Sequence, residues 1–222
     1  MPVITSLFTQ KNDPERVNVY LDGHFAFGIS ALSAAVHRLH EGRELDEAEV
    51  EALGQEDAVD RAHNAALNYL SFRPRSKREM EDYFRRRKVD SDTVASVLER
   101  LERAGLVDDG EFARFWVENR QTFRPRGTRA LRMELRQKGV QSETIEATVE
   151  SIGDETEIAL QAARQKLRSF AHLDDRTFQQ KMIGFLQRRG FPYGVSAHVA
   201  RDLVVERGGA DDDLTGAPIE ED

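Results

Sequence analysis

The sequence repeats itself with a period of 51 residues. The segment FRPRSKREMEDYFRRRKVDSDTVASVLERL begins at Phe72 and aligns without a gap on FRPRGTRALRMELRQKGVQSETIEATVESI, which begins at Phe123. A third and weaker copy, DDRTFQQKMIGFLQRRGFPYGVSAHVARDL, begins at Asp174. Tandem copies of this length are typical of proteins built from similar supersecondary units, each of which mainly contacts its neighbours. We therefore expect three similar modules in a row.

Apolar residues recur at four positions of the aligned copies, and we expect them to form the core of each module. They are Met80, Leu131 and Met182; Phe84, Leu135 and Leu186; Val89, Val140 and Phe191; and Leu101, Ile152 and Leu203.

Each module is expected to contain three helices. In the first copy, Ser76 followed by Glu79 is typical of a capping box that begins a helix. After a break near Val89, the spacing of Val94, Val97 and Leu101 predicts a second, amphipathic helix. The helix that precedes this pair is expected at about 58–70, 109–121 and 155–170 in the three modules.

The first 30 residues differ from the rest of the chain. Three short runs rich in β-branched and aromatic residues, VITSLFTQ, RVNVYL and HFAFGI, are separated by turn signals. Asp22-Gly23 suits a tight hairpin turn. The segment therefore predicts a β-hairpin or a three-stranded meander, which would need helices to pack on. Such helices are expected at 31–39 and 46–53, the second capped by Asp46 with Glu49 as its partner.

The predicted fold is mostly α, with three tandem three-helix repeats forming an elongated, curved molecule and a small N-terminal β-hairpin or meander. The expected segments are 1–56 for the β-rich part with short acidic helices, 57–106, 107–153 and 154–207 for the three repeats, and 208–222 for a disordered acidic tail.

Charge is distributed unevenly along the 222 residues, whose formal net charge is −8. Residues 1–60 carry 4 basic and 12 acidic side chains, residues 61–140 carry 19 and 12, and residues 141–222 carry 9 and 16. A cationic centre thus lies between acidic flanks. Such a centre suits a polyanionic partner, although it reads no base sequence by itself.

The basic side chains of this centre fall at equivalent places in the first two copies, which predicts one positive face for partner or nucleic-acid binding. The candidate residues are Arg73, Arg75, Lys77, Arg78, Arg85, Arg86, Arg87, Lys88, Arg124, Arg126, Arg129, Arg132, Arg136 and Lys138. The alternative is that these residues are solvated and paired with nearby carboxylates such as Glu79, Glu81 and Asp82.

Three aromatic residues, Phe112, Phe115 and Trp116, form a cluster in FARFWVENR. A platform for base stacking is one interpretation. Contacts between neighbouring helices are the favoured one, because aromatic residues at helical spacing usually close such contacts.

Several classes of function lack their usual residues. The chain has no cysteine and six histidines, and although His37 and His40 lie three apart, no third metal ligand is evident. Walker, GxGxxG and GxSxG motifs are missing. We therefore expect no enzyme activity, no metal and no cofactor. No apolar run approaches the roughly 18 residues of a membrane span, and no signal peptide is evident, so a cytoplasmic location is expected.

The repeats also resemble a known family. RPRSKREMEDYFRRRKVDSDTVASVLERLERAGLVDDGEFARFWVENR, followed by RPRGTRALRMELRQKGV, is similar to the central signature of RecX regulatory proteins. The similarity covers roughly residues 57–205. Its most specific parts are the S-x-x-E-M start, the GLVDDGEFAR junction from Gly105 to Arg114, and the stretch from Pro125 to Val140.

This resemblance implies a cytoplasmic regulator of homologous recombination and DNA repair, acting without catalytic residues. RecX proteins lodge in the groove of the RecA recombinase filament and typically inhibit its ATPase, strand exchange and growth. The implied partner is that filament, and single- or double-stranded DNA is a possible second partner. No membrane partner is expected, and the high charge favours a monomer. The third copy departs from the pattern, because Asp174 and Asp175 replace Phe-Arg and positive charge is lost there.

Two alternatives remain open. Short three-helix units with basic second helices also occur in helix-turn-helix proteins, so a helical DNA-binding protein or transcriptional regulator is the first. A purely structural helical-repeat adaptor is the second, and it would need no positive face.

Overall fold

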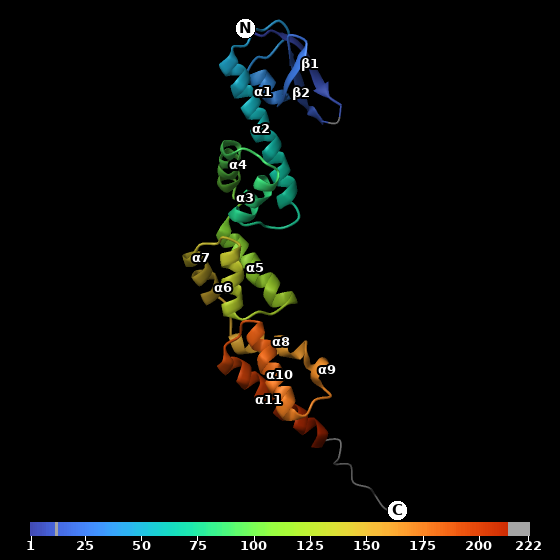
Figure 1. The fold of residues 1–222 in the computed structure, drawn as a ribbon, viewed down its shortest axis with the longest axis vertical. Coiled ribbons are helices and arrows are strands. Elements are labelled where there is room, and N and C mark those ends of the chain that lie inside the picture. Colours follow the sequence, from blue (N-terminus) through green and yellow to red (C-terminus); the bar gives the residue numbers. More distant parts are fainter. Residues whose placement is uncertain (12, 213–222) are drawn as a thin grey trace, which may run out of the picture. The chain divides into compact units, whose positions relative to one another are not determined.

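The computed structural model describes residues 1–11 and 13–212 and is mostly helical (Figure 1). The chain forms two compact units. The first contains Met1–Arg75 and Glu79–Val107, and the second contains Ser76–Arg78 and the chain from Asp108 onward. Within the described residues, no helix is both long enough and apolar enough to span a bilayer.

The N-terminal segment is a three-stranded antiparallel meander, as expected. Its strands β1 (Ile4–Gln10), β2 (Asp13–Leu21) and β3 (His24–Ser30) lie in the order β1-β2-β3. Asp22 and Gly23 join β2 to β3 with φ angles of 49° and 82°. Two left-handed residues in a two-residue turn match the twist of the flanking strands, which explains why Asp-Gly occurs here.

One face of the sheet packs against α1 (Ala31–Val36) and α2 (Glu47–Leu70). Ile4, Val19 and Ile29 are almost completely buried there, together with Leu53 of α2. The capping box predicted at the start of α2 is confirmed, since the side chain of Asp46 accepts the N–H of Glu49 and the Glu49 side chain accepts the N–H of Asp46.

The expectation of two separate helices at 46–53 and 58–70 is wrong, because α2 runs unbroken through 24 residues. Gly54 inside a helix costs only about 1 kcal/mol relative to alanine, so it does not end one. Beyond it, the buried carboxylate of Asp57 forms ion pairs with Arg16 of β2 and with Arg61, one turn further along. The boundary expected between residues 56 and 57 therefore falls inside α2.

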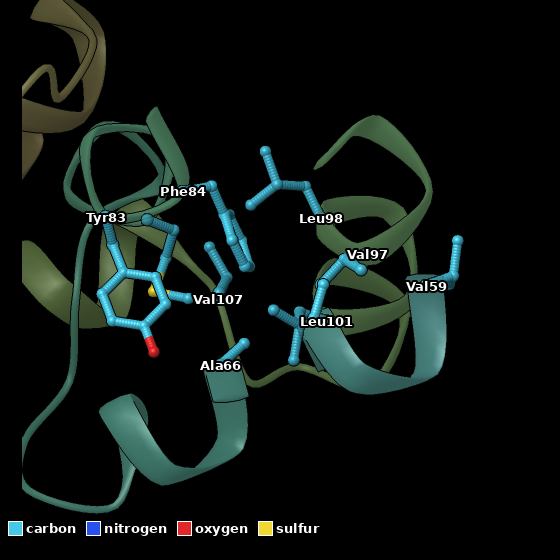
Figure 2. Close-up of a cluster of buried hydrophobic side chains, with 10 residues drawn as sticks. Val59, Ala66, Tyr83, Phe84, Val97, Leu98, Leu101 and Val107 are labelled. Carbon is cyan, nitrogen blue, oxygen red and sulfur yellow. The ribbon is translucent and has the colours of Figure 1, made fainter. Parts of the chain in front are cut away.

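The first three-helix module consists of the second half of α2, α3 (Lys77–Arg86) and α4 (Ser91–Arg103). Figure 2 shows how its side chains converge, with Val59 and Ala66 from α2, Phe84 from α3, and Leu101 from α4 among them. Tyr83 lies at the edge of this core, where its hydroxyl donates to the carbonyl of Ala65 at 2.9 Å.

The second unit contains two further modules, each with its own core. Its helices are α5 (Asp109–Phe123), α6 (Thr128–Gln137), α7 (Ser142–Glu150), α8 (Glu155–Arg164), α9 (Leu167–Phe170), α10 (Asp175–Arg188) and α11 (Tyr193–Asp212). The single helix expected at 155–170 is divided into α8 and α9. The tail was expected to begin at residue 208, whereas α11 continues to Asp212, and residues 213–222 lie outside the described part.

The apolar positions that recur between the copies are confirmed as core. All are at most 5% exposed except Val89 and Ile152, which are half-buried against the same clusters. The three-helix modules predicted from the period of 51 residues are thus present in the structure.

The second helix of each module ends in the same way. The N–H groups of Val89, Val140 and Phe191 donate to the carbonyls of Phe84, Leu135 and Leu186, at 3.2, 3.1 and 3.2 Å. The residues before them, Lys88, Gly139 and Gly190, have φ angles of 56°, 83° and 91°. This is a Schellman motif, in which a left-handed residue lets the chain satisfy the last carbonyls of the helix.

Candidate anion-binding surface

Some of the predicted basic residues in the first unit are paired with local carboxylates. Arg73 donates to both carboxylate oxygens of Glu79, at 2.9 Å each. Arg85 donates to Asp82 at 2.7 Å. The alternative of local pairing therefore describes these two arginines correctly, and their charge is largely balanced inside the protein.

Other basic residues of this unit lie over aromatic rings or extend into solvent. The guanidinium of Arg75 lies 4.0 Å from the ring centre of Tyr69, and that of Arg87 lies 3.8 Å from the ring centre of Tyr83. Such cation–π contacts fix the side chain without neutralising it. Arg86 and Lys88 are exposed, and within the described residues neither lies within ion-pair distance of a carboxylate.

Ser76 and the first two residues of α3 belong to the second unit and form hydrogen bonds within it. The Ser76 hydroxyl donates to the carbonyl of Lys138 at 2.7 Å, and the Lys77 N–H donates to Asp109 at 2.9 Å. The side chain of Arg78 covers Gly139, because a Cβ built on Gly139 would lie 2.6 Å from the Cβ of Arg78. Ser76 and Arg78 therefore lie against Lys138 and Gly139, at the C-terminal end of α6.

Three guanidinium groups gather near Pro125, in the loop between α5 and α6. Arg189 donates to the carbonyl of Pro125 at 3.2 Å, and the Gly127 N–H donates to the carbonyl of Arg189 at 3.0 Å. Burial lowers the pKa of Arg189, and the neighbouring charges of Arg126 and Arg124 lower it further. Positive groups held this close together favour an anion in their vicinity.

Glu134 of α6 balances part of this charge. Its carboxylate accepts hydrogen bonds from Trp116 Nε1 at 2.8 Å and Arg120 Nε at 2.7 Å, and it lies 3.5 Å from Arg126 Nε. Arg120 and Lys138 also lie 4.2 and 5.0 Å from the Trp116 ring centre. The Trp116 ring is therefore engaged by cations and its nitrogen by a carboxylate, which supports the favoured interpretation of helix contacts over base stacking.

An open groove of about 480 Å³ lies in the second unit beside α6. It is lined by Arg129, Ala130, Arg132, Met133 and Arg136 from α6, and by Gln187, Arg188 and Gly190 at the end of α10. Four of these eight residues are arginines. The groove thus brings together three of the predicted basic residues, Arg129, Arg132 and Arg136.

One carboxylate already lies against this groove. Glu146 of α7 accepts from Arg132 Nε at 2.8 and 3.1 Å, and lies 4.0 Å from Arg136. Among the described residues, no carboxylate lies within ion-pair distance of Arg129 or Arg188. Half of the arginines in the groove are therefore available to an external anion.

The sequence reasoning missed Arg188 and Arg189. The third copy was expected to lose its positive charge, yet Arg188 lines the groove and Arg189 joins the cluster at Pro125. The signal was present in the alignment, because QRRG of the third copy falls at the same place as RRRK and RQKG of the first two.

No arrangement for metal binding is found in the part of the chain that the structure describes. There, no three His, Cys, Asp or Glu side chains form a group that could hold a metal ion. His37 lies 3.0 Å from Glu56, and His40 lies 3.0 Å from the carbonyl oxygen of Glu41.

Four family models match the chain in succession. They are "Regulatory protein RecX N-terminal domain" over residues 2–46, "RecX, first three-helix domain" over 62–101, "RecX, second three-helix domain" over 108–149 and "RecX, third three-helix domain" over 153–199. Together they cover most of the 222 residues.

Similar proteins carry the same name. "Regulatory protein RecX" of Bacillus subtilis (strain 168) is 32% identical over 88% of this chain and 75% of its own length, and that of Bacillus pumilus (strain SAFR-032) is 30% identical over the same shares. Among solved structures, "Crystal structure of regulatory protein RecX" gives a TM-score of 0.71 at 26% identity, over 90% of this chain and 98% of that one. RecX from Lactobacillus salivarius gives a TM-score of 0.58 at 24% identity, over 67% and 98%, and supports the fold alone.

Proposed function

Because the chain belongs to the RecX family of regulatory proteins, we propose that it regulates the RecA recombinase by binding the RecA nucleoprotein filament. In this proposal it inhibits ATP hydrolysis, strand exchange and filament growth during homologous recombination and DNA repair in the cytoplasm. It acts by occupancy and carries out no chemistry of its own.

The observation that carries the proposal is the recurrence of exposed basic side chains on, or just after, the second helix of each module. Arg86 ends the second helix of the first module and Arg188 ends that of the third, at equivalent positions of the alignment, and Arg129 lies on the second helix of the module between them. Lys88 follows Arg86 by two residues, and among the described residues no carboxylate lies within ion-pair distance of any of the four. A nucleoprotein filament presents phosphate and acidic side chains at regular intervals. Repeated positive positions suit such a partner better than a single cluster does.

The ion pairs sort the predicted residues by their availability to a partner. Arg73 and Arg85 are engaged with Glu79 and Asp82, so removing their charge would also remove an ion pair within the protein. Arg86 and Lys88 are exposed without such a carboxylate among the described residues. Their substitution tests the contact with a partner and leaves the core intact.

The test is DNA-dependent ATP hydrolysis by preformed cognate RecA filaments, titrated with this protein. We expect hydrolysis to fall at less than one molecule per RecA subunit. A double variant, Arg86→Glu with Lys88→Glu, should require about tenfold more protein, because each reversed charge weakens an electrostatic contact by a fraction of a kcal/mol to a few kcal/mol. Arg176→Glu with Arg201→Glu is the matched control, since it changes the net charge equally at two exposed positions of the third module.

The alternative is a helical protein that acts on DNA directly. The same basic residues would support it, because tight duplex binding also requires positive charge. Binding to bare duplex DNA over a salt series separates the two. Unchanged ATP hydrolysis together with tight duplex binding would contradict filament regulation and favour the DNA-binding protein.

A further inference from the structure

One face of α6 combines positive charge with an exposed apolar side chain. Arg129, Arg132, Met133 and Arg136 follow the i, i+3, i+4, i+7 spacing of a single helix face, so they form a stripe about 10 Å long. Arg188 at the end of α10 borders the same groove. The groove is therefore a strip of guanidinium groups with a methionine in its middle.

Met133 is 56% exposed, although it is among the largest apolar side chains of its module. Beside it, the buried Ala130 also lines the groove. An exposed thioether gains free energy when an apolar group covers it, and methionine adapts its shape readily to such a group. A sugar–phosphate backbone offers no comparable surface. The apolar floor thus indicates a ligand that has apolar side chains as well as negative charge.

Glu146 shows which negative group fits the guanidinium groups. Its carboxylate accepts from Arg132 at 2.8 and 3.1 Å while it lies 4.0 Å from Arg136. The guanidinium groups on this face of α6 thus already bind one carboxylate, through a charge-assisted hydrogen bond from Arg132 and the nearby charge of Arg136. Arg129 and Arg188 line the same groove, and among the described residues no carboxylate lies within ion-pair distance of either.

We propose that this groove binds an acidic segment of a partner protein, with its carboxylates on Arg129 and Arg188 and a large apolar side chain on Met133. The inference rests on the proposed function, which it deepens by assigning one part of the basic surface to protein and not to nucleic acid. The stripe is about 10 Å long, so the part of the occupant that contacts it corresponds to about two turns of a helix.

The test measures fluorescence anisotropy with the full chain and three labelled probes. The first probe is a glutamate-rich peptide of about 14 residues, long enough to cover the stripe, with one central leucine. The second has serine in place of that leucine, and the third is an oligothymidylate of equal charge. The variants are Met133→Ala, which keeps the charge of the groove, and Arg188→Glu, which reverses one charge. Arg201→Glu is the matched control, because Arg201 is also exposed and does not line the groove.

We expect the leucine peptide to bind more tightly than the serine peptide. Met133→Ala should weaken binding of the leucine peptide by about threefold or more, in proportion to the apolar area lost. The same variant should bind the oligonucleotide as tightly as the unaltered protein does. Arg188→Glu should lower the affinity for both peptides by about tenfold, whereas Arg201→Glu should lower it far less. Equal binding of the two peptides, or an effect of Arg188→Glu confined to the oligonucleotide, would overturn the proposal.

These measurements contain no RecA, so their outcome tests the groove independently of the proposed function. Peptide binding in the groove without any effect on filament ATP hydrolysis would retain the acidic-segment site and reject the filament regulator. Inhibition of the filament that is insensitive to Met133→Ala, together with peptides that do not distinguish leucine from serine, would reject the site alone.

Discussion

The ends of α6 and α10 are built alike but contact different groups. Gly139 and Gly190 follow the two helices with φ angles of 83° and 91°. The N–H of the next residue donates to a carbonyl of the last helical turn in both cases. Over Gly139 lies the side chain of Arg78. Over Gly190 lies the main chain of Ala130, whose nitrogen would be 2.5 Å from an added Cβ.

The hydrogen bonds at the two helix ends also differ, because the donor is a side chain at the first end and the backbone at the second. At the first, the Ser76 hydroxyl donates to the carbonyl of Lys138, and at the second the Gly127 N–H donates to the carbonyl of Arg189. Ser76 and Gly127 are equivalent positions, 51 residues apart. At Gly139 two of the three atoms nearest to an added Cβ, the Cγ and Cδ of Arg78, belong to a flexible side chain that can adjust. At Gly190 all three are the nitrogen, Cα and Cβ of Ala130, which the backbone holds in place. Gly190 should therefore tolerate substitution far less than Gly139.

Gly190→Ala should have the largest effect. The new Cβ would lie 2.4 Å from the Cβ of Ala130 as well as close to its nitrogen, in a left-handed conformation that alanine disfavours. We expect a loss of about 3 kcal/mol or more in the free energy of unfolding of the second unit. Urea denaturation followed by the fluorescence of Trp116, the single tryptophan of the chain, measures it.

Gly194→Ala is the control for that measurement. A Cβ at Gly194 would meet nothing within 4 Å, and the residue lies in the first turn of α11. This change should be neutral or stabilise the unit by up to about 1 kcal/mol. Equal losses for the two variants would show that the close backbone approach at Gly190 is not what limits substitution.

Gly139→Ala should cost less, about 2 kcal/mol, because part of its clash is with a side chain. The new Cβ would lie 2.6, 3.2 and 2.7 Å from the Cβ, Cγ and Cδ of Arg78. In an Arg78→Ala background the last two contacts vanish, so the cost of Gly139→Ala should fall measurably in a double-mutant cycle. A cost independent of residue 78 would indicate that the left-handed conformation alone determines it.

Ser76→Ala should cost about 1 kcal/mol, the usual net contribution of one intramolecular hydrogen bond. The hydroxyl is completely buried, and alanine would leave the Lys138 carbonyl without that donor. The same Trp116 denaturation curve reports the change. A loss as large as that of Gly190→Ala would contradict the distinction between side-chain and backbone contacts.

The third equivalent position gives the smallest effect, with the opposite sign. Lys88 adopts the left-handed conformation with φ of 56°, which costs a residue with a Cβ about 1 kcal/mol relative to glycine. Lys88→Gly should therefore stabilise the first unit by about 0.5–1 kcal/mol. Slower amide exchange in α3 and α4 would show it, and unchanged exchange would mean that the strain is relieved elsewhere.

Much of the fold could be predicted because the period of 51 residues compares three versions of one module. Met80, Leu131 and Met182 are apolar at the same position and are all completely buried. The unbroken α2 could not be predicted in this way, because its polar middle is held by Asp57 and Arg16, 41 residues apart in sequence. A contact that occurs once in the chain leaves no trace in a comparison of repeats.

The site was predictable in its charge but not in its pairing. The basic residues of α6 were identified, yet their carboxylate neighbours depend on which helix faces which. Glu134 lies one helix away from Arg120, and Glu146 one helix away from Arg132. Met133 was not singled out, because an apolar residue in a helical pattern is usually assigned to the core. Only its 56% exposure distinguishes it.

The continuity of α2 also determines how the first unit unfolds. Leu53 belongs to the core under the sheet. Val59 and Ala66 belong to the core of the first three-helix module (Figure 2). One helix thus contributes residues to both cores, so unfolding of either core would disrupt the helix that the other core packs on. The sheet and the first module should consequently melt in a single cooperative transition. The family models end at residue 46 and resume at residue 62. We expect no independent unfolding on the two sides of that gap, because α2 runs through it.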